Sequence, residues 1–200
     1  MAGMRALIHD PAAPHGLRLE NVPDPVPGPA QALVEVSATS LNFGEVTYLA
    51  GRPVGSVPGW DAAGVVVAPA SSGEGPEVGA RVVTLAGDGG WARRRAVDVA
   101  DLAVLPDAVS HAAAAALPVA GVTALRALRR LGPVVGRRVL VTGASGGVGR
   151  FAVQLAARAG AHVIASVGSA ARGRGLSGFA RKPPRCPRQC PRARPNRYPR

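Results

Sequence analysis

The chain has 200 residues, a formal net charge of +12 and 47% hydrophobic residues, which suits one or two domains with a buried core. The sequence has no secretory signal, and its longest apolar run, 112–125, is too short to span a membrane, so a cytoplasmic protein without membrane association is expected. Both cysteines, Cys186 and Cys190, lie near the end of the chain, which excludes disulfides and thiolate metal sites from the rest.

Positive charge is concentrated at the end of the sequence. Ten of the 24 Lys and Arg residues lie from Arg172 onward, where there is no Asp or Glu, so the preceding residues are nearly neutral. The Arg- and Pro-rich segment 172–200 cannot bury enough apolar surface to fold and is predicted to be a disordered tail. Nucleic-acid binding through this tail is the weaker alternative, because the interleaved aromatic residues of single-strand binders are absent.

Residues 1–109 are typical of a β-rich domain. Short alternating runs are separated by turns rich in Pro, Gly, Asp and Ser. The predicted strands are 5–9, 17–22, 32–39, 64–68, 81–85 and 92–97. The run Arg93-Arg94-Arg95 on the last of these strands is interpreted as a solvated edge.

Residues 110–171 show a different pattern. A helical stretch begins at the N-cap candidate Ser110, is interrupted at Pro118 and ends at Gly132-Pro133. A buried strand follows at 139–141, then a glycine-rich turn, a helix from Arg150 and a second strand at 162–167. This order predicts one βαβ half of a dinucleotide-binding Rossmann domain.

The glycine-rich turn is the best candidate for a cofactor site. In the dinucleotide-binding fingerprint its spaced small residues fall on Ala144, Gly146 and Gly149, which allow a tight turn, a close approach of pyrophosphate and close helix packing. The predicted cofactor-binding loop is Ala144, Ser145, Gly146, Gly147, Val148 and Gly149. The alternative is a glycine-rich turn that binds nothing.

The segment after the second strand indicates which nicotinamide cofactor would bind. NAD enzymes place an acid there for the ribose 2′-hydroxyl, and this sequence has none. Ser169 and Arg172 instead offer a hydroxyl and a cation for a 2′-phosphate, which favours NADP(H). Alternatively, both are ordinary loop residues.

Several separated motifs carry a family resemblance. The stretches 40–43, 59–66 and 116–124, followed by the glycine turn, resemble the medium-chain dehydrogenase/reductase superfamily, and most closely its zinc-free quinone oxidoreductase and enoyl reductase branch. The resemblance implies an α/β plus β fold. It would have a GroES-like N-terminal domain over 1–109, an incomplete NADP-binding Rossmann domain over 110–171 and the disordered tail over 172–200.

The resemblance also implies site residues. It places Asn42 beside the nicotinamide and substrate and Thr123 near the cofactor, and Tyr48 is the candidate proton or hydrogen-bond donor. A turn-capping role for Asn42 and a packing role for Tyr48 remain as alternatives. Zinc-using members carry Cys and Gly-His-Glu where this chain has Asn42 and Gly59-Trp60-Asp61, so no catalytic zinc is expected.

The resemblance implies an NADPH-dependent reductase that transfers hydride to a quinone or an α,β-unsaturated carbonyl. Because the second half of the Rossmann domain does not follow, a truncated form with weak or no activity is expected, and uncovered apolar faces predict self-association or aggregation. A non-enzymatic β-domain interaction module and the basic tail as a nucleic-acid binder are the alternative functions.

Overall fold

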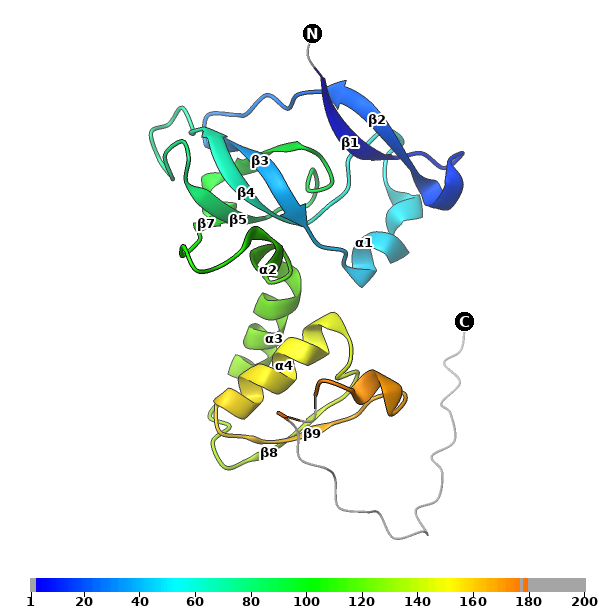
Figure 1. The fold of residues 1–200 in the computed structure, drawn as a ribbon, viewed down its shortest axis with the longest axis vertical. Helices are drawn as coiled ribbons and strands as arrows, with labels where there is room; N and C mark the ends of the chain where they lie inside the picture. The colour runs from blue at the N-terminus through cyan, green and yellow to red at the C-terminus, as the bar shows by residue number, and fades with distance from the viewer. Residues whose placement is uncertain (1–2, 177, 180–200) are drawn as a thin grey trace. The chain divides into compact units, whose positions relative to one another are not determined.

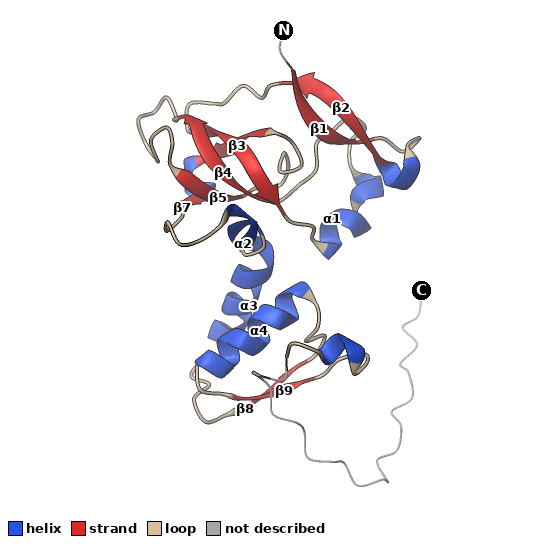
Figure 2. Ribbon diagram, viewed as in Figure 1, coloured by secondary structure: helices blue, strands red, loops and turns tan. Residues whose placement is uncertain are grey.

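The computed structural model describes residues 3–176 and 178–179. The chain divides into two compact units, Met1–Arg130 and Leu131–Arg200 (Figure 1). The first unit is built mainly of antiparallel strands, and the second contains a helix and two parallel strands (Figure 2). The predicted class, a β-rich domain followed by part of an α/β domain, is confirmed.

Two antiparallel sheets form the first unit. The strands β1 (Gly3–His9) and β2 (Leu17–Pro23) make a hairpin, and five further strands pair in the order β6-β3-β4-β5-β7. These five are β3 (Gln31–Thr39), β4 (Asp61–Ala68), β5 (Arg81–Leu85), β6 (Arg94–Asp98) and β7 (Leu102–Val104). Short 3-10 turns lie at Pro14–Gly16, Leu49–Gly51 and Val99–Asp101.

The hairpin joins the larger sheet through residues just before β6. The Leu7 N–H donates to the carbonyl of Trp91 at 2.9 Å, and the Arg93 N–H donates to the carbonyl of Arg5 at 3.0 Å. Met4 and Ala6 of β1 are buried together with Ala92. Backbone hydrogen bonds and apolar contacts thus both fix the hairpin to residues 91–93.

The core of the five-stranded sheet follows from alternation along its strands. Its buried residues are Ala32, Val34, Val66, Val82 and Val97. Gly64 lies in the middle of β4, beside a register shift in its pairing with β3. A Cβ built on Gly64 would lie only 1.9 Å from the carbonyl oxygen of Glu35, so the two strands approach as closely as glycine allows.

Two helices follow the strands of the first unit. Ser110 caps α2 (His111–Ala115) by accepting from the N–H of Ala113, and Pro118 is the first residue of α3 (Pro118–Arg130), where a missing N–H costs nothing. Ala114 and Ala115 of α2 are buried against Ala63 of β4. This packing places α2 in the first unit, which extends to Arg130; the expected boundary at 109/110 stays a prediction.

The second unit contains a βαβ arrangement. The strands β8 (Arg138–Val141) and β9 (His162–Ala165) pair in parallel, and α4 (Gly147–Arg158) connects them. The last described residues include a 3-10 turn at Ala171–Gly173 and a Leu176 side chain that is 4% exposed. Residues 177 and 180–200 of the expected disordered tail lie outside the described residues.

No helix in the described part of the chain is both long and apolar enough to cross a membrane.

Candidate functional site

The glycine turn connects the end of β8 to α4 by backbone geometry that requires glycine. Gly143 has a φ of 61°, and the Gly146 N–H donates to the Gly143 carbonyl at 2.9 Å. A Cβ on Gly149 would lie 2.3 Å from that carbonyl oxygen and 2.7 Å from the Cα of Ala144. The first turn of α4 therefore packs directly on the loop, as close helix–strand packing requires.

The N-terminus of α4 is open to an anion. Gly146 is the N-cap residue, Gly147 and Val148 are exposed, and the first N–H groups of a helix have no intrahelical acceptor. Ala144 is buried, and its N–H donates to the Ser166 carbonyl at 3.0 Å, which ties the loop to the end of β9. Arg150 Nε donates to the carbonyl of Ser145 at 3.1 Å. Exposed N–H groups at the positive end of a helix suit a phosphate group.

Ser169 and Arg172 share one exposed turn after β9. The Arg172 N–H donates to the Ser169 carbonyl at 3.1 Å and lies 3.4 Å from the Ser169 Oγ. Both residues are exposed, so a hydroxyl and a guanidinium are available on the same turn. The arrangement is compatible both with a 2′-phosphate site and with an ordinary turn.

Asn42 is held in the first unit by two carboxylates. It is the N-cap residue of α1 (Phe43–Thr47), and its N–H donates to Glu45 Oε2 at 2.6 Å. Its side-chain Nδ2 donates to Asp61 Oδ2 at 2.9 Å. Asn42 thus takes the capping position that was its alternative role, and it also presents a half-buried carboxamide in a fixed orientation.

The two carboxylates are buried and accept several hydrogen bonds. Glu45 is 1% exposed, and its Oε1 accepts from the N–H of Trp60 at 2.5 Å. Asp61 is 0% exposed and accepts from Ser40 Oγ at 2.8 Å and from the N–H of Val119, in the first turn of α3, at 3.2 Å. Sequence reasoning missed Glu45, although the spacing Asn-x-x-Glu is a capping-box signal.

The other predicted residues of the first unit are exposed. Tyr48 is the C-cap residue of α1, at the opposite end from Asn42, and is 71% exposed. Thr123 is exposed on α3, the helix whose first turn donates to Asp61. The described hydrogen bonds join neither Tyr48 nor Thr123 to Asn42.

A buried arginine completes the polar cluster. Arg95 is 1% exposed, which corrects the prediction that the Arg93-Arg94-Arg95 run is a solvated edge. Burial lowers its pKa to about 10, while the carboxylates of Asp61, Glu45 and Asp101 raise it. Arg95 therefore remains a cation at neutral pH and balances buried negative charge.

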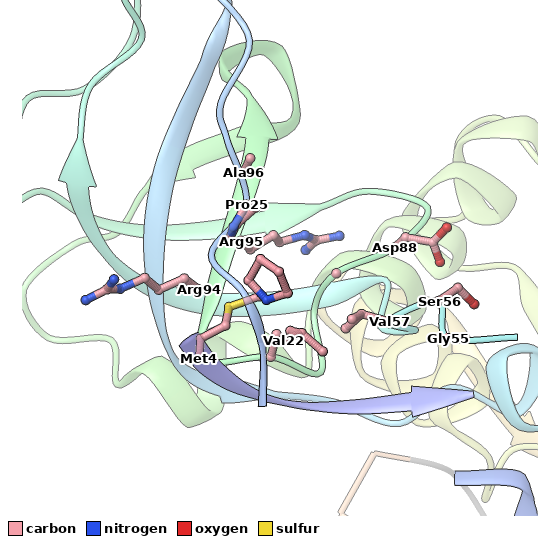
Figure 3. A pocket seen from close by; sticks show the side chains of 13 residues that line it. Met4, Val22, Pro25, Gly55, Ser56, Val57, Asp88, Arg94, Arg95 and Ala96 are labelled. Atoms are coloured by element: carbon pink, nitrogen blue, oxygen red, sulfur yellow. The ribbon is translucent and has the colours of Figure 1, made fainter. Parts of the chain in front are cut away.

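Arg95 also borders a cavity of about 560 Å³ in the first unit (Figure 3). In Figure 3 the side chains of Arg94 and Arg95 extend in opposite directions. The cavity is lined mainly by apolar side chains, including Met4, Val22 and Val57. None of Asn42, Tyr48 or Thr123 lines it, so it is distinct from the expected site.

Over residues 3–176 and 178–179, no three His, Cys, Asp or Glu side chains are grouped so that they could hold a metal ion. Both carboxylate oxygens of Asp61 already accept hydrogen bonds.

The chain is similar to proteins that are already known. Residues 28–107 match the family of the alcohol dehydrogenase GroES-like domain. The chain is 39% identical over 189 residues to the chloroplast envelope quinone oxidoreductase homolog of Arabidopsis thaliana, covering 84% of this chain and 57% of that protein. It is 40% identical over 177 residues to an erythronolide synthase of Saccharopolyspora erythraea, covering 86% of this chain and 5% of the synthase.

The fold is also similar to that of a solved structure. The structure of the mycobacterial protein Rv1454c complexed with NADPH matches with a TM-score of 0.80 and 28% identity, and the match covers 88% of this chain and 57% of that one. The chain spans little more than half the length of these single-enzyme relatives.

Proposed function

This chain belongs to the medium-chain dehydrogenase/reductase superfamily, and from that premise we propose that it binds NADPH and takes part in the reduction of a quinone or an α,β-unsaturated carbonyl. The observation that carries the proposal is the glycine-rich segment Gly143–Gly149, which leads from β8 into the open first turn of α4. The NADPH bound to the related mycobacterial protein supports this choice of cofactor.

The residues present fit a dinucleotide. The α4 N-terminus and the glycine loop would hold the pyrophosphate, and Ser169 with Arg172 would hold the 2′-phosphate. When bound, NADPH supplies a hydride. In this proposal the carboxamide of Asn42 orients the reacting groups, and the exposed hydroxyl of Tyr48 donates a hydrogen bond or proton to the oxygen that gains charge.

Arg172 tests the cofactor preference. The chain is expected to bind NADPH more tightly than NADH in a fluorescence titration. Arg172→Ala should reduce this preference by about tenfold or more, because a hydrogen bond to a charged group contributes about 1.5–3 kcal/mol. Arg174→Ala, which removes another exposed arginine, is the matched control and should leave the ratio of dissociation constants unchanged. An equal ratio in Arg172→Ala and the unaltered chain would contradict the assignment.

The proposal is metal-free. Purified protein is expected to contain no stoichiometric zinc by elemental analysis, and treatment with EDTA should leave the affinity for NADPH unchanged. The physical reason is that Asn42, Ser40 and Val119 already donate to the single carboxylate, Asp61, that stands where a ligand would be needed. If EDTA lowers the affinity for NADPH and added zinc restores it, this part of the proposal is wrong.

A further inference from the structure

Three buried charged groups lie in the first unit, and none of them has a direct part in the proposed reaction. Glu45 and Asp61 are the two carboxylates that hold Asn42, and Arg95 is the cation whose pKa responds to both. Burying a charge is costly unless it is paired and hydrogen-bonded. The cluster therefore needs a role that a set of apolar side chains could not fill.

Arg95 is linked by hydrogen bonds to the backbone on both sides of Asp61. Its Nη2 donates to the carbonyl of Gly59 at 3.2 Å. Its Nη1 donates to Thr84 Oγ1 at 2.8 Å, and this hydroxyl donates to the carbonyl of Ala62 at 3.3 Å. The segment 59–62 is thereby fixed at both ends by one guanidinium.

The same segment holds Asn42. Asp61 accepts from the Asn42 side chain, and Trp60 donates its N–H to Glu45, which accepts from the Asn42 N–H through its other oxygen. Two paths therefore lead from Arg95 to Asn42 through hydrogen bonds and the backbone of segment 59–62, one to the Asn42 side chain and one to its backbone. Each path passes through a buried carboxylate.

We propose that Arg95 is a positioning residue for Asn42: it fixes segment 59–62 and balances the charge of the two carboxylates that orient the Asn42 carboxamide. The importance of this for catalysis rests on the proposed function of Asn42. Lysine would keep the charge but lose the planar fork that reaches Gly59 and Thr84 together. Methionine would fill a similar space and would remove both the charge and the hydrogen bonds to Gly59 and Thr84.

NMR spectroscopy of the full chain tests the proposal without requiring activity. In Arg95→Met, the side-chain amide signal of Asn42 should shift, and hydrogen exchange at the Trp60 N–H should accelerate by about tenfold or more, as expected when a hydrogen bond to a charged group is weakened. Arg95→Lys should restore part of both effects. Arg94→Met is the matched control, because Arg94 pairs instead with Asp24 at 2.6 Å, and it should change neither signal.

A milder variant covers the case in which Arg95→Met does not fold. Thr84→Val keeps the shape of the side chain and removes the link to Ala62, so it should shift the Asn42 amide in the same direction. If Arg95→Met folds and the NMR signal of the Asn42 side-chain amide does not shift, the proposal is overturned. If Arg95→Met does not fold, an unshifted Asn42 signal in Thr84→Val overturns it. Failure of the unaltered chain to bind NADPH would instead count against the proposed function and leave this measurement intact.

Discussion

Gly64→Ala is expected to destabilise the chain by about 3 kcal/mol or more, at the upper end of what overpacking costs. The added Cβ would lie 1.9 Å from the carbonyl oxygen of Glu35 and 2.8 Å from its carbonyl carbon, both backbone atoms that no side-chain rotation can move. Relief requires β3 and β4 to separate at the centre of the five-stranded sheet. Urea unfolding followed by circular dichroism measures the loss.

Gly51→Ala is the matched control. Nothing lies within 4 Å of a Cβ at Gly51, and its backbone is not in the left-handed region. Alanine should therefore be neutral there, or slightly stabilising because it reduces the entropy of the unfolded chain. Equal unfolding midpoints for Gly64→Ala and Gly51→Ala would show that the two strands tolerate separation.

Asp61→Ala is expected to lower the free energy of unfolding by about 3 kcal/mol or more, because each buried donor left without a partner costs about 1–3 kcal/mol. The substitution removes the acceptor of the Ser40 hydroxyl, the Asn42 carboxamide and the Val119 N–H. It also removes the carboxylate at the N-terminus of α3, a favourable position for negative charge. Chemical denaturation monitored by tryptophan fluorescence measures the change.

Asp88→Ala serves as the control for this experiment. The Asp88 side chain is 60% exposed and pairs with Arg52, so its loss should cost less than about 1 kcal/mol, as is usual for surface ion pairs. Comparable losses for Asp61→Ala and Asp88→Ala would mean that water replaces the buried carboxylate, and that Asn42 is not rigidly held.

Much of the fold could be predicted because its signals are local. Alternating apolar residues and turn-forming residues located the first six strands, and β5 has the predicted bounds. The βαβ order was also predicted, since a β-branched run, a glycine turn and a helical pattern follow one another directly. Ser110 caps α2, as the sequence predicts, because an N-cap depends only on the three residues that follow it.

The missed elements depend on contacts between distant residues. The three-residue strand β7 has no pattern of its own and is defined by pairing with β5. Helix α1 has only five residues, and its Gly44 packs against the ring of Trp60, where a Cβ would come within 2.6 Å. A short helix with a central glycine is not favoured by propensity, so tertiary packing decides.

The candidate site also has one part that the sequence predicts and another that depends on contacts between distant residues. The glycine loop could be found from spacing, because every residue of the turn lies within one short segment. The burial of Arg95 could not be predicted, since three consecutive arginines on a strand indicate a solvated edge. Its partners Gly59 and Thr84 come from other segments, and only the folded sheet brings them together.

The attachment of the N-terminal hairpin has a consequence for folding kinetics. Leu7 and Arg5 of β1 bond to Trp91 and Arg93, so one of the earliest strands completes its backbone contacts with residues near the end of the β-rich unit. Closing so long a loop is entropically costly before the contacts are made, and topologies of high contact order fold slowly. During synthesis, β1 and β2 therefore lack these contacts until residues 91–93 have left the ribosome, and a two-stranded hairpin by itself is only marginally stable in water.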